Sequence, residues 1–146
     1  NLDPRTIQIT PSVNTAIALC LRALTQPGDG ILIQNPSYSP FRKVAALNQR
    51  RCVINELIQK GDHYELDLAD FEAKLSEVRM FILCSPHNPT SKVFSPQELE
   101  AMLSLCRKHQ VLVIAERFTP TGLWNDDGGQ CSGSGSHDHF IAKQDV

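Results

Sequence analysis

The stretch MFILCSPHNPT at residues 80–90 decides the fold. Its first five residues are apolar, which is too short a run for a buried helix but typical of a strand covered on both faces. The prolines that follow, Pro86 and Pro89, cannot continue a strand because proline has no backbone N–H to donate. The sequence therefore predicts a central strand that ends in a polar loop, and in open α/β sheets ligands bind at such strand ends.

Strand and helix patterns alternate on both sides of this stretch. Short apolar or alternating runs predict strands over residues 6–10, 31–33, 51–57 and 111–114. Apolar residues at helical spacing predict helices over residues 13–24, 41–47, 68–75 and 96–108. The last helix opens with a capping box, in which Ser95 is the N-cap and Glu98 lies three positions later. The alternation predicts an α/β fold with a mostly parallel, doubly wound sheet.

The composition argues against some classes of partner and leaves small-molecule chemistry open. The chain has 146 residues, 41% of them hydrophobic, which is enough for the core of one domain. Its net charge of -2 includes no basic stripe, so we expect neither a nucleic-acid partner nor a membrane surface. No apolar run approaches the roughly 18 residues of a transmembrane helix. The cysteines stand singly without a C-x-x-C pair, and we expect a cytoplasmic location.

The C-terminal part of the chain differs in character from the rest. Residues 119–146 contain five glycines and no apolar periodicity. We therefore divide the chain into residues 1–116, which form the domain, and residues 117–146, which we expect to be a disordered tail. The tail includes His137, Asp138 and His139, which are metal-binding residue types. Without further ligands in a rigid frame they do not predict a metal site.

Several motifs occur together in the first 116 residues. They are ITPSV at 9–13, PGD at 27–29, PSYSPF at 36–41, LCSPHNPT at 83–90 and VIA at 113–115. In this order and spacing they resemble the class I and II aminotransferases of pyridoxal 5'-phosphate (PLP) fold type I. Within that family the resemblance is to the bacterial cystathionine β-lyase, or carbon–sulfur lyase, subgroup. It implies that the chain is the central part of the family's large domain, as a fragment that lacks segments on both sides.

The resemblance implies a set of residues that contact the PLP cofactor. Val13 and Asn14 open the first helix, whose N-terminus would hold the phosphate group. Tyr38 corresponds to the aromatic residue that stacks on the pyridine ring. Asn88 corresponds to the asparagine that donates to the phenolic oxygen of the cofactor.

The residues alone leave simpler roles open for these positions. A tyrosine between prolines, like Tyr38, is often a packed turn residue, and Asn88 can cap a turn. We read His87 as a loop hydrogen-bonder rather than a catalyst. Ser12 and Ser91 stand where the family commonly has glycine, and serine at position 91 predicts a backbone that avoids positive φ.

The resemblance fails at the positions that carry the chemistry. In the family, the strand that corresponds to residues 111–115 ends in Asp-Glu-Ile-His, and its aspartate pairs with the pyridine nitrogen. Here Ala115 is followed by Glu116 and Arg117. The family's Ser-x-x-Lys or Pro-Ser-Lys motif, whose lysine bonds to the cofactor, is also missing, and Lys143 does not match it. We assign no catalytic residue, and the activity of this chain stays open.

Reading-frame shifts explain both missing motifs. Removing one base from an aspartate codon converts the family's Ala-Asp-Glu-Ile-His into the sequence found at residues 115–120. Residues 138–146, read one base later, can encode Thr-Ile-Leu-Ser-Pro-Ser-Lys-Thr-Phe. We hypothesise that the tail is a frameshifted reading of a once complete gene. The alternative is a genuine but divergent tail.

The resemblance implies β-elimination from a sulfur amino acid by a PLP-dependent homodimer. Aminotransfer by the same family is the alternative within the enzyme class. A truncated remnant without catalytic activity is the alternative outside it.

Overall fold

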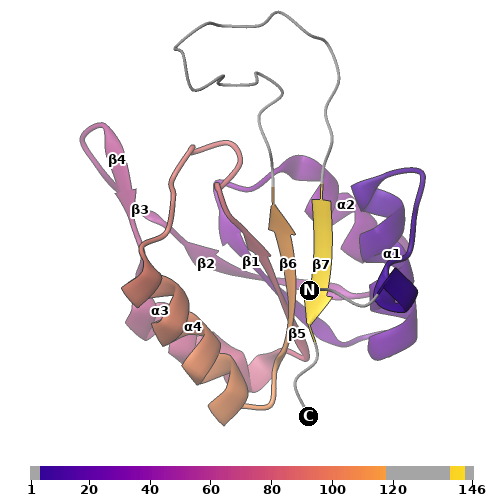
Figure 1. Ribbon diagram of the computed structural model, residues 1–146. Helices are drawn as coiled ribbons and strands as arrows, with labels where there is room; N and C mark the ends of the chain where they lie inside the picture. Colours follow the sequence, from indigo (N-terminus) through magenta and orange to yellow (C-terminus); the bar gives the residue numbers. More distant parts are fainter. Residues whose placement is uncertain (1–3, 118–138, 144–146) are drawn as a thin grey trace, which may run out of the picture.

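The computed structural model describes residues 4–117 and 139–143 (Figure 1). Its helices are η1 (Pro4–Thr6), α1 (Val13–Leu24), α2 (Ser39–Leu47), α3 (Leu68–Lys74), η2 (Leu75–Glu77) and α4 (Pro96–Lys108). Its strands are β1 (Gly30–Asn35), β2 (Arg51–Glu56), β3 (Ile58–Lys60), β4 (His63–Glu65), β5 (Met80–Cys84), β6 (Leu112–Arg117) and β7 (His139–Lys143).

A five-stranded sheet forms the centre of the molecule, with the strand order β2-β1-β5-β6-β7. β5 lies in the middle, as the apolar run at residues 80–84 predicts, and all of its residues are buried. β1 runs parallel to both of its neighbours, with Leu32 opposite Val53 and Phe81. β5 and β6 are also parallel, whereas β7 pairs antiparallel with β6. The predicted α/β fold with a mostly parallel sheet is confirmed.

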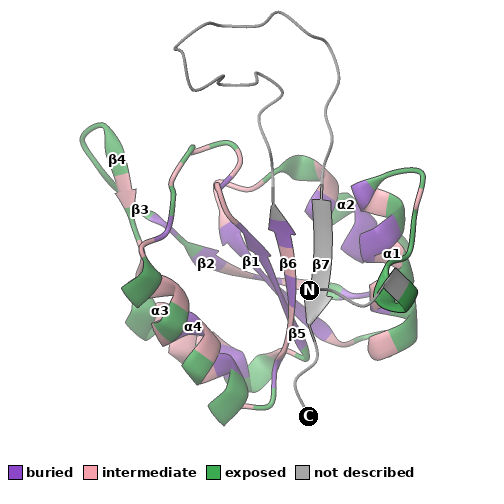
Figure 2. Ribbon diagram, in the orientation of Figure 1, coloured by how far each residue is buried: buried purple, intermediate pink, exposed green. Residues whose placement is uncertain are grey.

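Helices cover both faces of the sheet, so the sheet is doubly wound (Figure 1). α1 and α2 pack on the face that carries Met80 and Ile82 of β5. α3 and α4 pack on the opposite face, with Phe81 and Leu83. Successive side chains of a strand point to opposite faces, and β5 therefore contributes to both cores. Figure 2 shows the buried residues gathered along the strands and on the inner sides of the helices.

The helix starts follow from their capping residues. Ser12 is the N-cap of α1, and its Oγ accepts a hydrogen bond from the backbone N–H of Thr15 at 3.2 Å. At α4 both bonds of the predicted capping box form: Ser95 Oγ accepts from the Glu98 N–H at 3.1 Å, and Glu98 Oε2 accepts from the Ser95 N–H at 2.8 Å. None of the described helices is long and apolar enough to cross a membrane.

One prediction from an apolar pattern, the strand over residues 6–10, is wrong. Residues 7–10 form no strand, and the side chains of Ile7 and Ile9 are 61% and 86% exposed. An alternating pattern forms a strand only beside a partner strand, and no described strand pairs with this segment. The helix predicted over residues 41–47 is confirmed by α2, in which the last residue, Leu47, is 74% exposed.

Two short elements were not expected from the sequence. β3 and β4 form an antiparallel hairpin, whose turn contains Gly61 with φ +61. β7 lies inside the segment that we expected to be disordered, and the structure therefore differs from that expectation at residues 139–143. Residues 118–138 and 144–146, which include His137 and Asp138, fall outside the described residues.

Candidate functional site

The N-terminus of α1 and the loops after β1 and β5 lie at one edge of the sheet (Figure 1). α1 leads into β1, so the helix runs opposite to the strand and its first turn lies at the carboxyl end of the strand. β5 pairs parallel with β1, and its carboxyl end reaches the same edge. The topology therefore brings together the segments that carry Val13, Asn14, Tyr38 and Asn88. In open α/β sheets this edge is the usual place for a ligand.

The first turn of α1 presents backbone donors at this edge. Ser12 has an extended backbone, and its carbonyl oxygen accepts the N–H of Ala16 at 3.1 Å, the first bond of the helix. The amides of Val13 and Asn14 precede that bond and have no acceptor within the helix. The Val13 side chain is buried in the core below. In the described part of the chain, Asn14 Oδ1 is buried and has no hydrogen-bond partner.

Tyr38 lies in the loop after β1 and is the N-cap residue of α2. Its ring packs edge-on against Phe41, with centroids 5.5 Å apart and planes at 84°. The tyrosine is still 38% exposed. Asn35 orders this loop, because its Oδ1 accepts hydrogen bonds from the Ser37 N–H at 3.2 Å and from Arg42 at 2.7 Å. Tyr38 is thus a packed turn residue that keeps part of its ring open to a ligand.

Asn88 lies half-buried in a closed loop after β5. The His87 N–H donates to the Lys92 carbonyl at 2.8 Å, and the Ser91 N–H donates to the His87 carbonyl at 2.7 Å. Ser91 has φ +57, so the prediction that serine keeps this position out of positive φ is wrong. The turn that Ser91 closes requires the left-handed conformation, and serine adopts it at a cost of roughly 1 kcal/mol relative to glycine.

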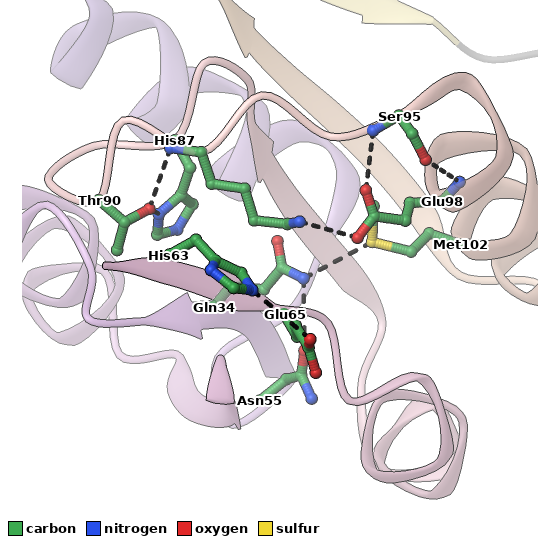
Figure 3. A network of polar contacts seen from close by, with 10 residues as sticks. Gln34, Asn55, His63, Glu65, His87, Thr90, Ser95, Glu98 and Met102 are labelled. Atoms are coloured by element: carbon green, nitrogen blue, oxygen red, sulfur yellow. Dashed lines mark hydrogen bonds and ion pairs between the residues drawn. The ribbon is translucent and has the colours of Figure 1, made fainter. Parts of the chain in front are cut away.

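His87 is 3% exposed and holds the loop from within (Figure 3). Its Nδ1 lies 2.8 Å from Thr90 Oγ1, and its ring also hydrogen-bonds to the backbone of Gln34. Burial lowers the pKa of His87; the bond to Gln34 acts in the opposite direction, and the charge of Lys92 lowers the pKa further. The imidazole is therefore neutral at pH 7. The interpretation of His87 as a loop hydrogen-bonder agrees with this geometry.

Sequence reasoning missed a buried polar cluster beneath the loop. Gln34 Nε2 donates to Asn55 Oδ1 at 3.3 Å (Figure 3). Asn55 Nδ2 donates in turn to Asp70 Oδ2 at 2.8 Å. Gln34 and Asn55 are 3% and 0% exposed. The available signal was a polar residue inside each of two buried strands, which alone does not reveal that the two side chains meet.

The end of β6 carries a carboxylate at the same edge. Glu116 follows Ala115, is 5% exposed and lies opposite Cys84 of β5. Its carbonyl oxygen accepts the Ser85 N–H at 3.1 Å. Among the described residues, no group of three or more His, Cys, Asp or Glu side chains could hold a metal ion.

Comparisons with known proteins agree with this arrangement. The family model for class I and II aminotransferases matches residues 1–117. Cystathionine beta-lyase PatB from Bacillus subtilis (strain 168) is 38% identical over 119 residues, which make up 80% of this chain and 31% of the lyase. The crystal structure of cystalysin from Treponema denticola, which contains a PLP cofactor, matches with a TM-score of 0.69 and 25% identity over 74% of this chain and 36% of that one.

An aminotransferase structure matches equally well. N-Succinyldiaminopimelate aminotransferase from Mycobacterium tuberculosis has a TM-score of 0.73 and 30% identity, over 77% of this chain and 30% of that one. The present chain thus spans about a third of the length of the proteins that it matches.

Proposed function

Because the chain belongs to the class I and II aminotransferase family, which depends on PLP, we propose that it is the cofactor-holding part of a carbon–sulfur β-lyase acting on sulfur amino acids. One observation carries the proposal: the first turn of α1 and the loops after β1 and β5 meet at one edge of the sheet. Each segment presents a group suited to a phosphorylated pyridine ring. The 38% identity to a cystathionine beta-lyase supports the choice of lyase.

The first turn of α1 is the proposed phosphate site. The amides of Val13 and Asn14, which have no acceptor within the helix, and the positive end of the helix dipole favour an anion there. Asn14 Oδ1 is buried without a hydrogen-bond partner in the described part of the chain. This amide oxygen can only accept a hydrogen bond, so a phosphate oxygen cannot satisfy it directly, but a water bound beside the phosphate can donate to it.

Tyr38 and Asn88 are the proposed contacts to the cofactor ring. Phe41 fixes the Tyr38 ring edge-on, and its exposed part can stack on a flat heterocycle. The Asn88 side chain can donate a hydrogen bond to a phenolic oxygen. When bound, PLP supplies an electron sink for bonds at the amino-acid Cα. The roles of these residues are to bind and orient the ring.

We propose that this chain by itself does not turn over substrate. Its sequence contains no Ser-x-x-Lys or Pro-Ser-Lys motif, so the family's cofactor lysine has no counterpart. The carboxylate after Ala115 is Glu116 rather than an aspartate. We further propose that residues 1–116 form the family domain and that residues 117–146 are a frameshifted tail.

Aminotransfer is the second candidate, since the chain is also 30% identical to an aminotransferase of similar fold. A non-catalytic remnant is the third. The homodimer and the cytoplasmic location that we expect from the sequence stay predictions.

The test is to sequence the gene from the codon of Val113 to beyond that of Val146 and to express the product that other reading frames restore. We expect those frames to encode an aspartate after Ala115 and then a Pro-Ser-Lys segment. The restored protein should release pyruvate from L-cystathionine, while the present chain with added PLP should release none.

Other results would contradict parts of this proposal. Amino-group transfer to a keto acid without pyruvate release would favour the aminotransferase. Other reading frames that contain only stop codons and unrelated residues would overturn the frameshift hypothesis. Pyruvate release by the present chain would show that the missing motifs are dispensable.

A further inference from the structure

His87 occupies a position between two segments of the candidate site. It follows β5 directly before Asn88, and its ring reaches back to β1 through the backbone of Gln34. The other contact of the ring is the Thr90 hydroxyl, 2.8 Å from Nδ1, within its own loop (Figure 3). One buried imidazole therefore ties the loop after β5 to the carboxyl end of the neighbouring strand.

The hydrogen bonds of a neutral imidazole match these partners. The contact with the Gln34 backbone favours the protonated ring, which means that the ring donates and a carbonyl oxygen accepts. The neutral ring has a single N–H, so its other nitrogen must accept a hydrogen bond. The Thr90 hydroxyl supplies that proton at Nδ1. Every polar atom of the ring is thus satisfied while its side chain is almost fully buried.

The backbone of His87 closes the loop around Asn88. Its N–H donates to the Lys92 carbonyl and its carbonyl accepts from the Ser91 N–H. Asn88 therefore sits inside a loop that is closed by two backbone hydrogen bonds and bridged by the imidazole. The Phe94 ring packs edge-on against the imidazole, with centroids 6.1 Å apart, and limits its rotation.

We propose that His87 is a positioning residue that fixes the Asn88 side chain for its contact with the phenolic oxygen of the cofactor. This inference rests on the proposed function. His87 itself touches neither cofactor nor substrate in this account. Its contacts order the loop before the cofactor binds, so binding through Asn88 carries no further entropy cost of ordering the loop.

The test compares two probes on the full chain: pyridoxamine 5'-phosphate, which needs no lysine, and its 3-deoxy analogue, which lacks the phenolic oxygen. His87→Leu removes both ring hydrogen bonds, whereas His87→Gln keeps a donor and an acceptor. We expect His87→Leu to weaken pyridoxamine 5'-phosphate about tenfold and the 3-deoxy analogue less than about twofold. His87→Gln should recover most of the loss, and the exposed His63→Leu should change neither affinity.

A double-mutant cycle shows whether the effect passes through Asn88. In an Asn88→Ala background, His87→Leu should cause no further loss for pyridoxamine 5'-phosphate, because the contact that it supports is already gone. An equal loss for both probes, or a full loss on top of Asn88→Ala, would make His87 a structural residue only and overturn the inference.

A second measurement tests the positioning role of His87 without a ligand. Hydrogen exchange at the amides of His87 and Ser91 should accelerate in His87→Leu and return towards the wild-type rate in His87→Gln. If the wild-type chain binds no pyridoxamine 5'-phosphate, the proposed function fails. Exchange rates that are unchanged in His87→Leu overturn the positioning role in either case.

Discussion

At the scale of single residues, Arg50 joins the ends of two helices. Its side chain is buried and donates to the carbonyl oxygens of Leu21 and Thr25 at 2.9 and 2.7 Å and to Thr25 Oγ1 at 2.9 Å. It also donates to the Asn48 carbonyl at the C-cap of α2. The last carbonyls of a helix have no partner within the helix, and a cation is favoured there.

We therefore predict that Arg50→Met lowers the free energy of unfolding by about 2–4 kcal/mol, because several buried carbonyl oxygens lose their donor. Urea denaturation of the full chain measures the change. Arg51→Met is the matched control, since Arg51 is exposed and its bonds to Gly28 and Glu77 are 3.3 and 3.2 Å long. An equal loss of unfolding free energy in Arg50→Met and Arg51→Met would show that the burial of the Arg50 guanidinium adds nothing to stability.

Single residues also show how far sequence reasoning reaches. His87 could be read as a loop hydrogen-bonder because it lies between prolines in a polar loop. Its tie to Gln34 could not be predicted, since that contact depends on β1 and β5 being neighbours. The prediction for the Ser91 backbone is wrong because residue type alone argues against a positive φ. The turn that the Ser91 N–H closes requires this conformation, and φ is +57.

At the scale of elements, the start of α4 couples a cap to an ion pair. Lys92 Nζ lies 2.8 Å from Glu98 Oε1, while Glu98 Oε2 accepts the Ser95 N–H. Burial raises the pKa of Glu98, but the hydrogen bonds from Lys92 and Ser95 and the Lys92 charge together hold it below the ordinary value. The charged carboxylate therefore stabilises the folded state.

The sign of this shift predicts the pH dependence of stability. Because the pKa of Glu98 is lower in the folded state than in the unfolded chain, the charged carboxylate stabilises the fold fully above the ordinary pKa of 4.5. This stabilisation is lost as the pH falls through the pKa of the folded state. We expect Glu98→Gln to cost roughly 1 kcal/mol at pH 7, with the difference from wild type vanishing in acid. Urea denaturation from pH 7 down to pH 3 measures it.

Glu100→Gln on the same helix is the control for this prediction. Its partner is Arg107 in an exposed pair, and we expect a smaller loss of stability. A difference between Glu98→Gln and wild type that grows as the pH falls would contradict the account of the cap.

Elements with strong local signals were predicted best. The capping box of α4 and the apolar run of β5 contain the information for their structure within a few residues. The false strand at residues 6–10 and the missed hairpin of β3 and β4 depend on whether a partner strand lies alongside. Pairing between strands is a property of the fold, so a local pattern cannot supply it.

At the scale of the whole molecule, the parallel sheet explains why distant motifs lie at one edge. The N-terminus of α1 and the loop after β5 are far apart in the sequence but share one edge, because β1 and β5 are neighbouring parallel strands. β7 covers the edge of β6 in the described structure. Unpaired sheet edges are aggregation sites, and in the described sheet the two edge strands are β2 and β7.

The central claim is that the first turn of α1 holds the phosphate of a pyridoxal-type cofactor. The most direct test measures the affinity of the full chain for pyridoxamine 5'-phosphate and for pyridoxamine, which lacks the phosphate. Asn14→Asp places a negative charge at the proposed site. Arg22→Gln, in the last turn of the same helix, changes the net charge by the same amount away from the site.

We predict that the wild-type chain prefers the phosphorylated probe. Asn14→Asp should weaken that probe about tenfold or more and leave pyridoxamine within about twofold, since like charges repel at short range. Arg22→Gln should leave both affinities unchanged. Equal affinity of the wild-type chain for the two probes, or equal effects of the two variants, would contradict a phosphate site at α1.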